Sequence, residues 1–158
     1  MGKTWIVAAN RSNARIFEVE RGTDTPREIE DLVDPAGRAH ERDLTSDAAG
    51  RFYGKGERNQ GHSAGPEASQ SQHEVERFAI QIRDYLDRAH AAHRFEQLWV
   101  IAAPAFLGAL RTKLSKAVTA ALELEVDKDV PTHTPREIFE LALSERAAKA
   151  AHRAAAER

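Results

Sequence analysis

The chain of 158 residues contains no cysteine, one methionine and few aromatic residues, which make up 6% of it. Without cysteine the protein has no disulfide bond, thiolate metal ligand or cysteine nucleophile. It also lacks a long hydrophobic run, because the apolar stretch Trp5 to Ala9 is too short for a signal peptide or a membrane span. We therefore expect a cytoplasmic protein that does not insert into a membrane.

The chain also lacks a large excess of charge of one sign. Its net charge is −2, from 23 basic and 25 acidic residues, so bulk charge does not attract nucleic acid and any such contact has to be local. Hydrophobic residues make up 41% and charged residues 30% of the chain, as is usual for a soluble globular domain. The length fits one domain.

Short apolar runs in the first part of the chain predict three strands without an intervening helix. They cover residues 4–9, 14–20 and 28–33, with a turn over 10–13. The alternation in the second run slips at Phe17. The third run ends at Asp34-Pro35, because proline cannot donate to the ladder of a sheet.

Helical spacing begins only after residue 70. Ser71 and Glu74 have the spacing of a capping box, which predicts a helix over 72–92. Thr134, Pro135 and Glu137 predict the start of the last helix in the same way. The elements expected between these two helices are a strand over 98–102, a helix over 104–114, a short helix to about 120 and an edge strand over 122–127.

This order of elements predicts a mixed α/β fold. Three strands joined without helices favour antiparallel pairing, and the later strand–helix–strand units favour parallel pairing. We expect a five-stranded mixed sheet of order 3-2-1-4-5 with helices on both faces, which is the ribonuclease-H-like arrangement. Residues 1–146 would form this domain, and the Ala-rich helical tail 147–158 would fray.

The stretch 35–70 has almost no apolar periodicity, and five of the nine glycines lie between Gly50 and Gly65. Such a long loop is usually functional or disordered, and we expect it to be flexible. Its part 50–62 has an excess of two positive charges and includes aromatic residues, a composition suited to phosphates and exposed bases. The candidate RNA contacts are Arg42, Arg51, Phe52, Tyr53, Lys55, Arg58 and His62. The charge over 36–70 is balanced, so a merely flexible loop stays an alternative.

Three catalytic or metal-binding patterns fail on their context. Gly61 to Gly65 fits G-x-S-x-G around Ser63, but no strand precedes it and the helix is expected only at Ser71, so a nucleophile elbow is not predicted. A two-metal nuclease needs an acid on the first strand, which ends at Asn10. His90 and His93 lie one turn apart, but no third histidine continues this spacing along the helix. We therefore expect no metal and no cofactor.

Several segments together resemble the bacterial host-attachment protein family over nearly the whole chain. They are WIVAANRSNARIF, GRAHERDLTSDAAGR, HEVERFA, VIAAPAFLGALR and LEVDKD. The residues that carry the family motif are Asn10, Asp43, Thr45, Ser46 and Asp47. Many members have aspartate where this chain has Asn10. The family name implies a role in attachment to host cells.

The family is in turn similar to the middle domain of archaeal and eukaryotic peptide-chain release factors, which is also ribonuclease-H-like. In those factors a Gly-Gly-Gln tip on the loop after the third strand helps to place water against the peptidyl-tRNA ester. This resemblance implies an RNA- or ribosome-associated module with a tRNA or ribosome as partner. Gln60, in Asn59-Gln60-Gly61, would be its candidate catalytic residue. The alternative is a non-catalytic attachment factor that binds a protein partner through the loop or the C-terminal helix.

Overall fold

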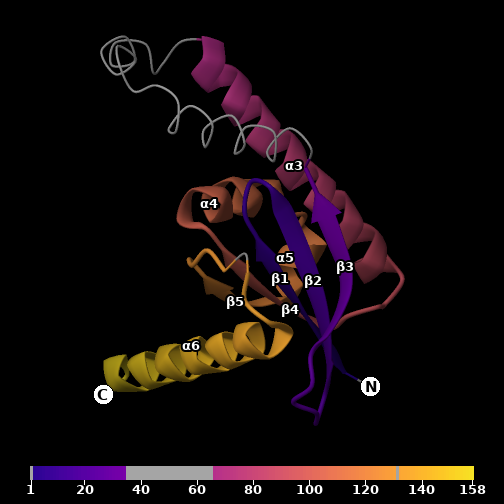
Figure 1. The fold of residues 1–158 in the computed structure, drawn as a ribbon. Helices are drawn as coiled ribbons and strands as arrows, with labels where there is room; N and C mark the ends of the chain where they lie inside the picture. Colours follow the sequence, from indigo (N-terminus) through magenta and orange to yellow (C-terminus); the bar gives the residue numbers. More distant parts are fainter. Residues whose placement is uncertain (1, 35–65, 131) are drawn as a thin grey trace.

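A computed structural model describes residues 2–34, 66–130 and 132–158 of the protein. Its centre is a five-stranded sheet (Figure 1) of order β3-β2-β1-β4-β5, in which β1 pairs antiparallel with β2 and parallel with β4. The strands are β1 (Lys3–Ala9), β2 (Asn13–Glu20), β3 (Arg27–Val33), β4 (Gln97–Ala102) and β5 (Leu122–Val126). The predicted mixed sheet, its strand order and the edge position of the last strand are confirmed.

The slip in the pattern at Phe17 reflects burial on both faces of the sheet. Ile16 and Phe17 point to opposite faces and both are fully buried, one in each of two hydrophobic clusters. The pairing of β2 with β3 also shifts here, because Ile16 lies opposite Glu30 and Phe17 opposite Glu28. Because helices cover both faces of the sheet, consecutive residues in the middle of a strand are both expected to be apolar.

Helices cover both faces of the sheet, as predicted. They are α3 (Pro66–Ala91), α4 (Pro104–Lys113), α5 (Lys116–Ala121) and α6 (Pro135–Ala156). Helices α3, α4 and α5 pack on one face, where Phe78, Ile82 and Leu86 of α3 are buried against β1 and β4. On the other face, α6 buries Ile138 and Phe139. Figure 1 shows α3 and α6 on opposite sides of the sheet.

The helix that the sequence predicts over 72–92 starts earlier in the structure. It begins at Pro66, so Ser71 lies inside α3 and is not its N-cap, and residues 66–70 are helical instead of part of the loop. Proline is favoured in the first turn of a helix, where its missing N–H costs no hydrogen bond. The remainder of the predicted loop, residues 35–65, lies outside the described residues.

The last helix starts as predicted. The Thr134 hydroxyl accepts a hydrogen bond from the N–H of Glu137 at 3.1 Å, and the Glu137 carboxylate accepts one from the N–H of Thr134 at 2.8 Å. This second bond from the Thr134 backbone is the main cause that lowers the pKa of Glu137. The helix continues to Ala156, and every residue from Arg146 to Arg158 is exposed. Fraying of 147–158 stays a prediction.

Within the described residues, no helix is long and apolar enough to cross a membrane.

Candidate functional site

The turn between β1 and β2 lies at the carboxyl ends of the parallel strands β1 and β4. Open α/β sheets commonly bind ligands at this edge. Asn10 organises the turn, because its Oδ1 accepts hydrogen bonds from the N–H groups of Ser12 at 2.8 Å and Asn13 at 3.0 Å. Its Nδ2 donates to the carboxylate of Asp129, which follows β5, at 3.2 Å. Asn10 thus closes the turn and connects it to the far end of the sheet.

Arg11 and Ser12 connect the same turn to α3 and β3. The Arg11 guanidinium donates to the hydroxyl of Ser71 at 2.8 Å and lies 3.9 Å from the carboxylate of Glu74. The carbonyl of Ser12 accepts a hydrogen bond from the N–H of Asp34 at 2.8 Å. The Nε of Arg11 and the hydroxyl of Ser12 are buried without a partner among the described residues. Each such buried polar group costs free energy.

A pocket of about 290 Å³ opens beside this turn. Its lining residues are Asn10, Arg11, Val75, Ala103, Ala105, Phe106 and Asp129. Ala103 is the N-cap of α4 and provides no side-chain cap, and two first-turn residues of this helix, Ala105 and Phe106, line the pocket. The lining therefore combines apolar side chains with one positive and one negative group. In the described part of the chain, no three His, Asp or Glu residues come together to hold a metal ion.

Asn10 is the one predicted site residue that lies within the described ranges. The candidate catalytic residue Gln60 lies outside the described residues. The RNA-binding candidates and the other motif residues also lie outside: Arg42, Asp43, Thr45, Ser46, Asp47, Arg51, Phe52, Tyr53, Lys55, Arg58 and His62. Residues near both ends of this stretch are held by the β1–β2 turn: Asp34 by Ser12, and Ser71, five residues into α3, by Arg11.

The position of α3 also changes the argument about Ser63, which lies outside the described residues. Only Ala64 and Gly65 separate Ser63 from the first helical residue, Pro66. The expectation of a distant helix, one of the two reasons against a nucleophile elbow, is therefore wrong. The other reason, the polar sequence before Ser63, still argues against an elbow because an elbow needs an entering strand.

His90 and His93, near the end of α3, help to end the helix. His93 has a φ of 58°, and the N–H groups of His93 and Arg94 donate to the carbonyls of His90 at 2.9 Å and Ala89 at 2.9 Å. This is the Schellman arrangement that ends many helices. The ring of His90 packs against Phe95 at a centroid distance of 5.4 Å. Both histidines thus terminate the helix and fix the chain that enters β4.

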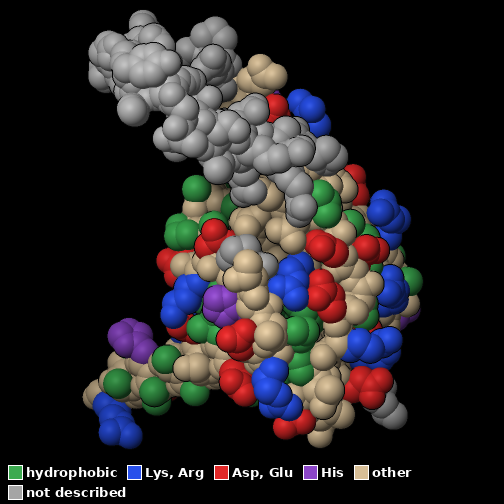
Figure 2. Space-filling view, viewed as in Figure 1, with side chains coloured by type: hydrophobic (Ala, Val, Ile, Leu, Met, Phe, Trp, Pro, Cys, Tyr) green, Lys and Arg blue, Asp and Glu red, His purple; other side chains and the backbone are tan. Residues whose placement is uncertain are grey.

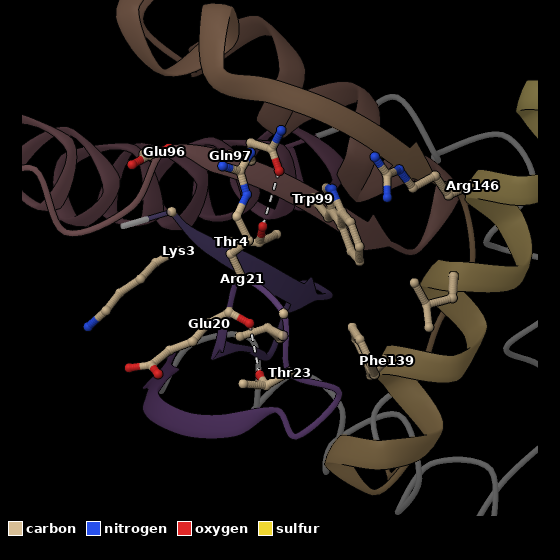
Figure 3. Close-up of a pocket in the computed structure, with 14 residues that line it drawn as sticks. Lys3, Thr4, Glu20, Arg21, Thr23, Glu96, Gln97, Trp99, Phe139 and Arg146 are labelled. Atoms are coloured by element: carbon tan, nitrogen blue, oxygen red, sulfur yellow. Dashed lines mark hydrogen bonds between the residues drawn. The ribbon is translucent and has the colours of Figure 1, made fainter.

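A second hollow, of about 260 Å³, lies at the opposite edge of the sheet (Figure 3), beside α6 and the turn after β2. Trp99 forms its aromatic wall: the ring stacks on Phe139 at 6.3 Å, and the Arg146 guanidinium lies 5.5 Å from its centroid. Glu123 accepts hydrogen bonds from Trp99 Nε1 at 3.0 Å and from Arg146 at 2.9 Å. This group is not predictable from the sequence, because its members come from three elements and share no local pattern.

Glu18 is a buried acid near this edge, with 7% of its surface exposed. Its carboxylate accepts hydrogen bonds from Trp5 Nε1 at 3.1 Å, Arg27 at 2.9 Å and Lys3 at 3.3 Å. Burial by itself raises the pKa of Glu18, but these three donors together outweigh burial and hold the pKa below its usual value. The arrangement satisfies the carboxylate fully, as expected of a structural ion cluster.

The fold and the site define a mixed α/β protein with a candidate ligand edge at β1 and β4. Over residues 5–141 the chain matches the family described as "Protein required for attachment to host cells", and it belongs to that family, as the sequence resemblance predicts. No curated protein matches the chain significantly.

Two solved structures are similar to the chain. One is the archaeal translation termination factor aRF1, with 10% sequence identity and a TM-score of 0.44, where the match covers 98% of this chain and 42% of the other. The second is described as an archaeal protein, with 9% identity and a TM-score of 0.45, and the match covers 98% of this chain and 41% of the other. The chain thus spans about two fifths of the length of either protein.

Proposed function

We propose that this host-attachment protein is an RNA- or ribosome-associated module that contacts tRNA or rRNA through residues 38–66. The observation that supports this proposal is that the chain on both sides of the segment is held by a single turn. Asp34, four residues before the segment, and Ser71, five residues after it, are hydrogen-bonded to Ser12 and Arg11 at the carboxyl edge of the sheet. A segment fixed in this way is presented by a rigid scaffold, as binding loops commonly are.

The composition of the segment supplies the chemistry. Arg51, Lys55 and Arg58 would neutralise phosphates, and Phe52 and Tyr53 would stack on exposed bases. By contrast, the face of the described domain seen in Figure 2 mixes acidic and basic side chains. We therefore assign RNA contact to the segment and not to the surface of the domain.

Co-sedimentation with ribosomes tests this proposal. Replacing Arg51, Lys55 and Arg58 together by alanine is expected to weaken binding and to make it less dependent on salt. Three phosphate contacts on single-stranded RNA correspond to about a twentyfold loss of affinity between 50 and 200 mM salt, which the variant would not show. The matched control replaces Arg77, Arg88 and Lys116, three exposed basic residues of α3 and α5. Equal binding and equal salt dependence of both variants and the wild type would contradict the proposal.

The catalytic part of the proposal needs its own test. Gln60 would orient a water molecule for hydrolysis of the peptidyl-tRNA ester, without a metal ion. Release of the peptide from a model peptidyl-tRNA by the wild type, but not by Gln60→Ala, would support this role. A wild-type rate equal to the uncatalysed rate would leave the protein as a binding module only. Loss of hydrolysis after Ser63→Ala with retention after Gln60→Ala would instead favour a serine nucleophile.

The second candidate function is a non-catalytic attachment factor that binds a protein partner. The observation that favours it is the length of α6, which continues to Ala156 with residues 146–158 exposed. Fractionation of native cells separates the two functions. A pool that sediments with ribosomes supports RNA association, and a pool that fractionates with the cell envelope supports attachment.

A further inference from the structure

The second half of α6 projects from the domain as a bare helix. Figures 1 and 2 show it extending away from the sheet, with apolar side chains along its side. Leu143, just before this half (residues 146–158), is 41% exposed and is one of two exposed large hydrophobic residues in the described ranges. A helical stretch of this length without packing is marginally stable in water. The projecting half therefore gains stability if another surface covers it.

Exposed alanines lie on several sides of this half, and three of them continue the side that Leu143 begins. Leu143, Ala147, Ala150 and Ala154 follow one another at spacings of four, three and four residues, the heptad spacing of helices that pack in pairs, and we call these four residues the seam. Other residues of this half contact β5: Arg146 donates to Glu123 at 2.9 Å, and Lys149 donates to the carbonyl of Glu125. Leu143 also lines the hollow beside Trp99, and the contacts with β5 leave Ala147, Ala150 and Ala154 exposed.

The charges on α6 are divided between its two halves. Residues 135–145 contain three glutamates and one arginine, whereas residues 146–158 contain four lysine or arginine residues and one glutamate. Two copies of α6 in antiparallel orientation would place the acidic half of each beside the basic half of the other. This self-complementary distribution is the property that an interface with two-fold symmetry requires.

We propose that a second copy of this chain covers the seam, through antiparallel pairing of the two α6 helices. With Leu143 of one copy opposite Ala150 of the other, Glu140 lies beside Arg153 and Arg136 beside Glu157, in two symmetry-related sets. Alanine in the seam permits close approach of the two helix backbones. Ala147 of each copy lies next to the two-fold axis. This inference is independent of any RNA contact by residues 38–66.

Charge reversal tests the pairing in the full-length chain. Glu140→Lys alone and Arg153→Glu alone each place like charges opposite one another in a homodimer, and each is expected to weaken dimerisation about tenfold. An equimolar mixture of the two variants restores both pairs and is expected to form a heterodimer of wild-type affinity. Analytical ultracentrifugation at low salt measures these affinities. Circular dichroism checks that the helix stays intact, because Glu140 also lies 3.7 Å from Arg136 in the same helix.

A cysteine substitution tests the position of the axis directly, since the chain has no cysteine of its own. Ala147→Cys is expected to form a disulfide-linked dimer on mild oxidation. Ala117→Cys, at an exposed position of α5, is the control and is expected to stay monomeric. A wild type that is monomeric at every concentration would overturn the proposal. A dimer that is insensitive to the charge reversals and does not crosslink through position 147 would overturn it as well.

Discussion

The guanidinium of Arg11 donates a hydrogen bond of 2.8 Å to the hydroxyl of Ser71, 60 residues along the chain. This contact joins the β1–β2 turn to the side of α3 and lies beside the candidate pocket. Because Glu74 is 3.9 Å from the same guanidinium, Arg11 meets α3 at two successive turns of the helix. The contact therefore fixes the direction in which α3 leaves the edge of the sheet.

A double-mutant cycle measures this contact. Arg11→Ala, Ser71→Ala and the double variant are compared by urea unfolding, and the expected coupling free energy is about 1 kcal/mol. Ser144→Ala, at an exposed position of α6, serves as the control for replacing a helical serine. If Ser71 were the N-cap that the sequence predicts, Ser71→Ala would cost the same with or without Arg11. A coupling near zero would contradict the contact.

Local patterns predict most of the fold correctly. Strand alternation, the helical face of α3 and the capping box at Thr134 depend on residues within a few positions, and the structure confirms them. The error at Ser71 arises because a capping box is a local pattern that the five helical residues before it override. The spacing of a capping box cannot show that a helix has already begun upstream when the upstream residues have no clear helical pattern.

The candidate site is less predictable from sequence than the fold. The sequence predicts a turn at Asn10, and the structure confirms it. The partners of this turn, Asp129 and Ser71, are 119 and 60 residues away from Asn10 and Arg11 and have no periodic relation to them. Contacts of this kind depend on the strand order and the crossovers. The residues with the most distinctive composition, Arg51 to Arg58, stay a prediction because they lie outside the described residues.

The N-cap of α6 gives a direct test of local stabilisation. Thr134→Ala removes the hydroxyl that accepts from Glu137 and is expected to lower the free energy of unfolding by about 1 kcal/mol. Thr119→Ala, at an exposed position within α5, is expected to be neutral or slightly stabilising, because alanine is the better helix former. The measurement is the midpoint of urea unfolding for each variant, compared with the wild type. Equal midpoints would show that the cap is dispensable.

The buried Glu18 predicts a specific dependence of stability on pH. Its pKa is lowered in the folded state, so its stabilising contribution is complete above the unfolded value of 4.5 and is lost as the pH falls through the folded value. Glu18→Gln is expected to cost about 2 kcal/mol at neutral pH, and this difference from the wild type should shrink below pH 4.5. Glu20→Gln, at an exposed position on the same strand, should show no such trend. Unfolding curves over this pH range provide the measurement, and a constant difference would contradict the role assigned to Glu18.

Asn10 and Asp129 allow a reciprocal exchange that tests the candidate site itself. Asn10→Asp keeps the acceptor for Ser12 and Asn13 but loses the donor to Asp129, and it places two carboxylates near the 3.2 Å that now separate the two side chains. Repulsion raises the pKa of the carboxylate pair, so the expected destabilisation of about 1–2 kcal/mol applies at neutral pH and is relieved as the pH falls and the pair binds a proton. The double variant Asn10→Asp with Asp129→Asn exchanges donor and acceptor and is expected to recover the wild-type stability at neutral pH. If the double variant is as unstable as Asn10→Asp alone, the contact does not hold the turn.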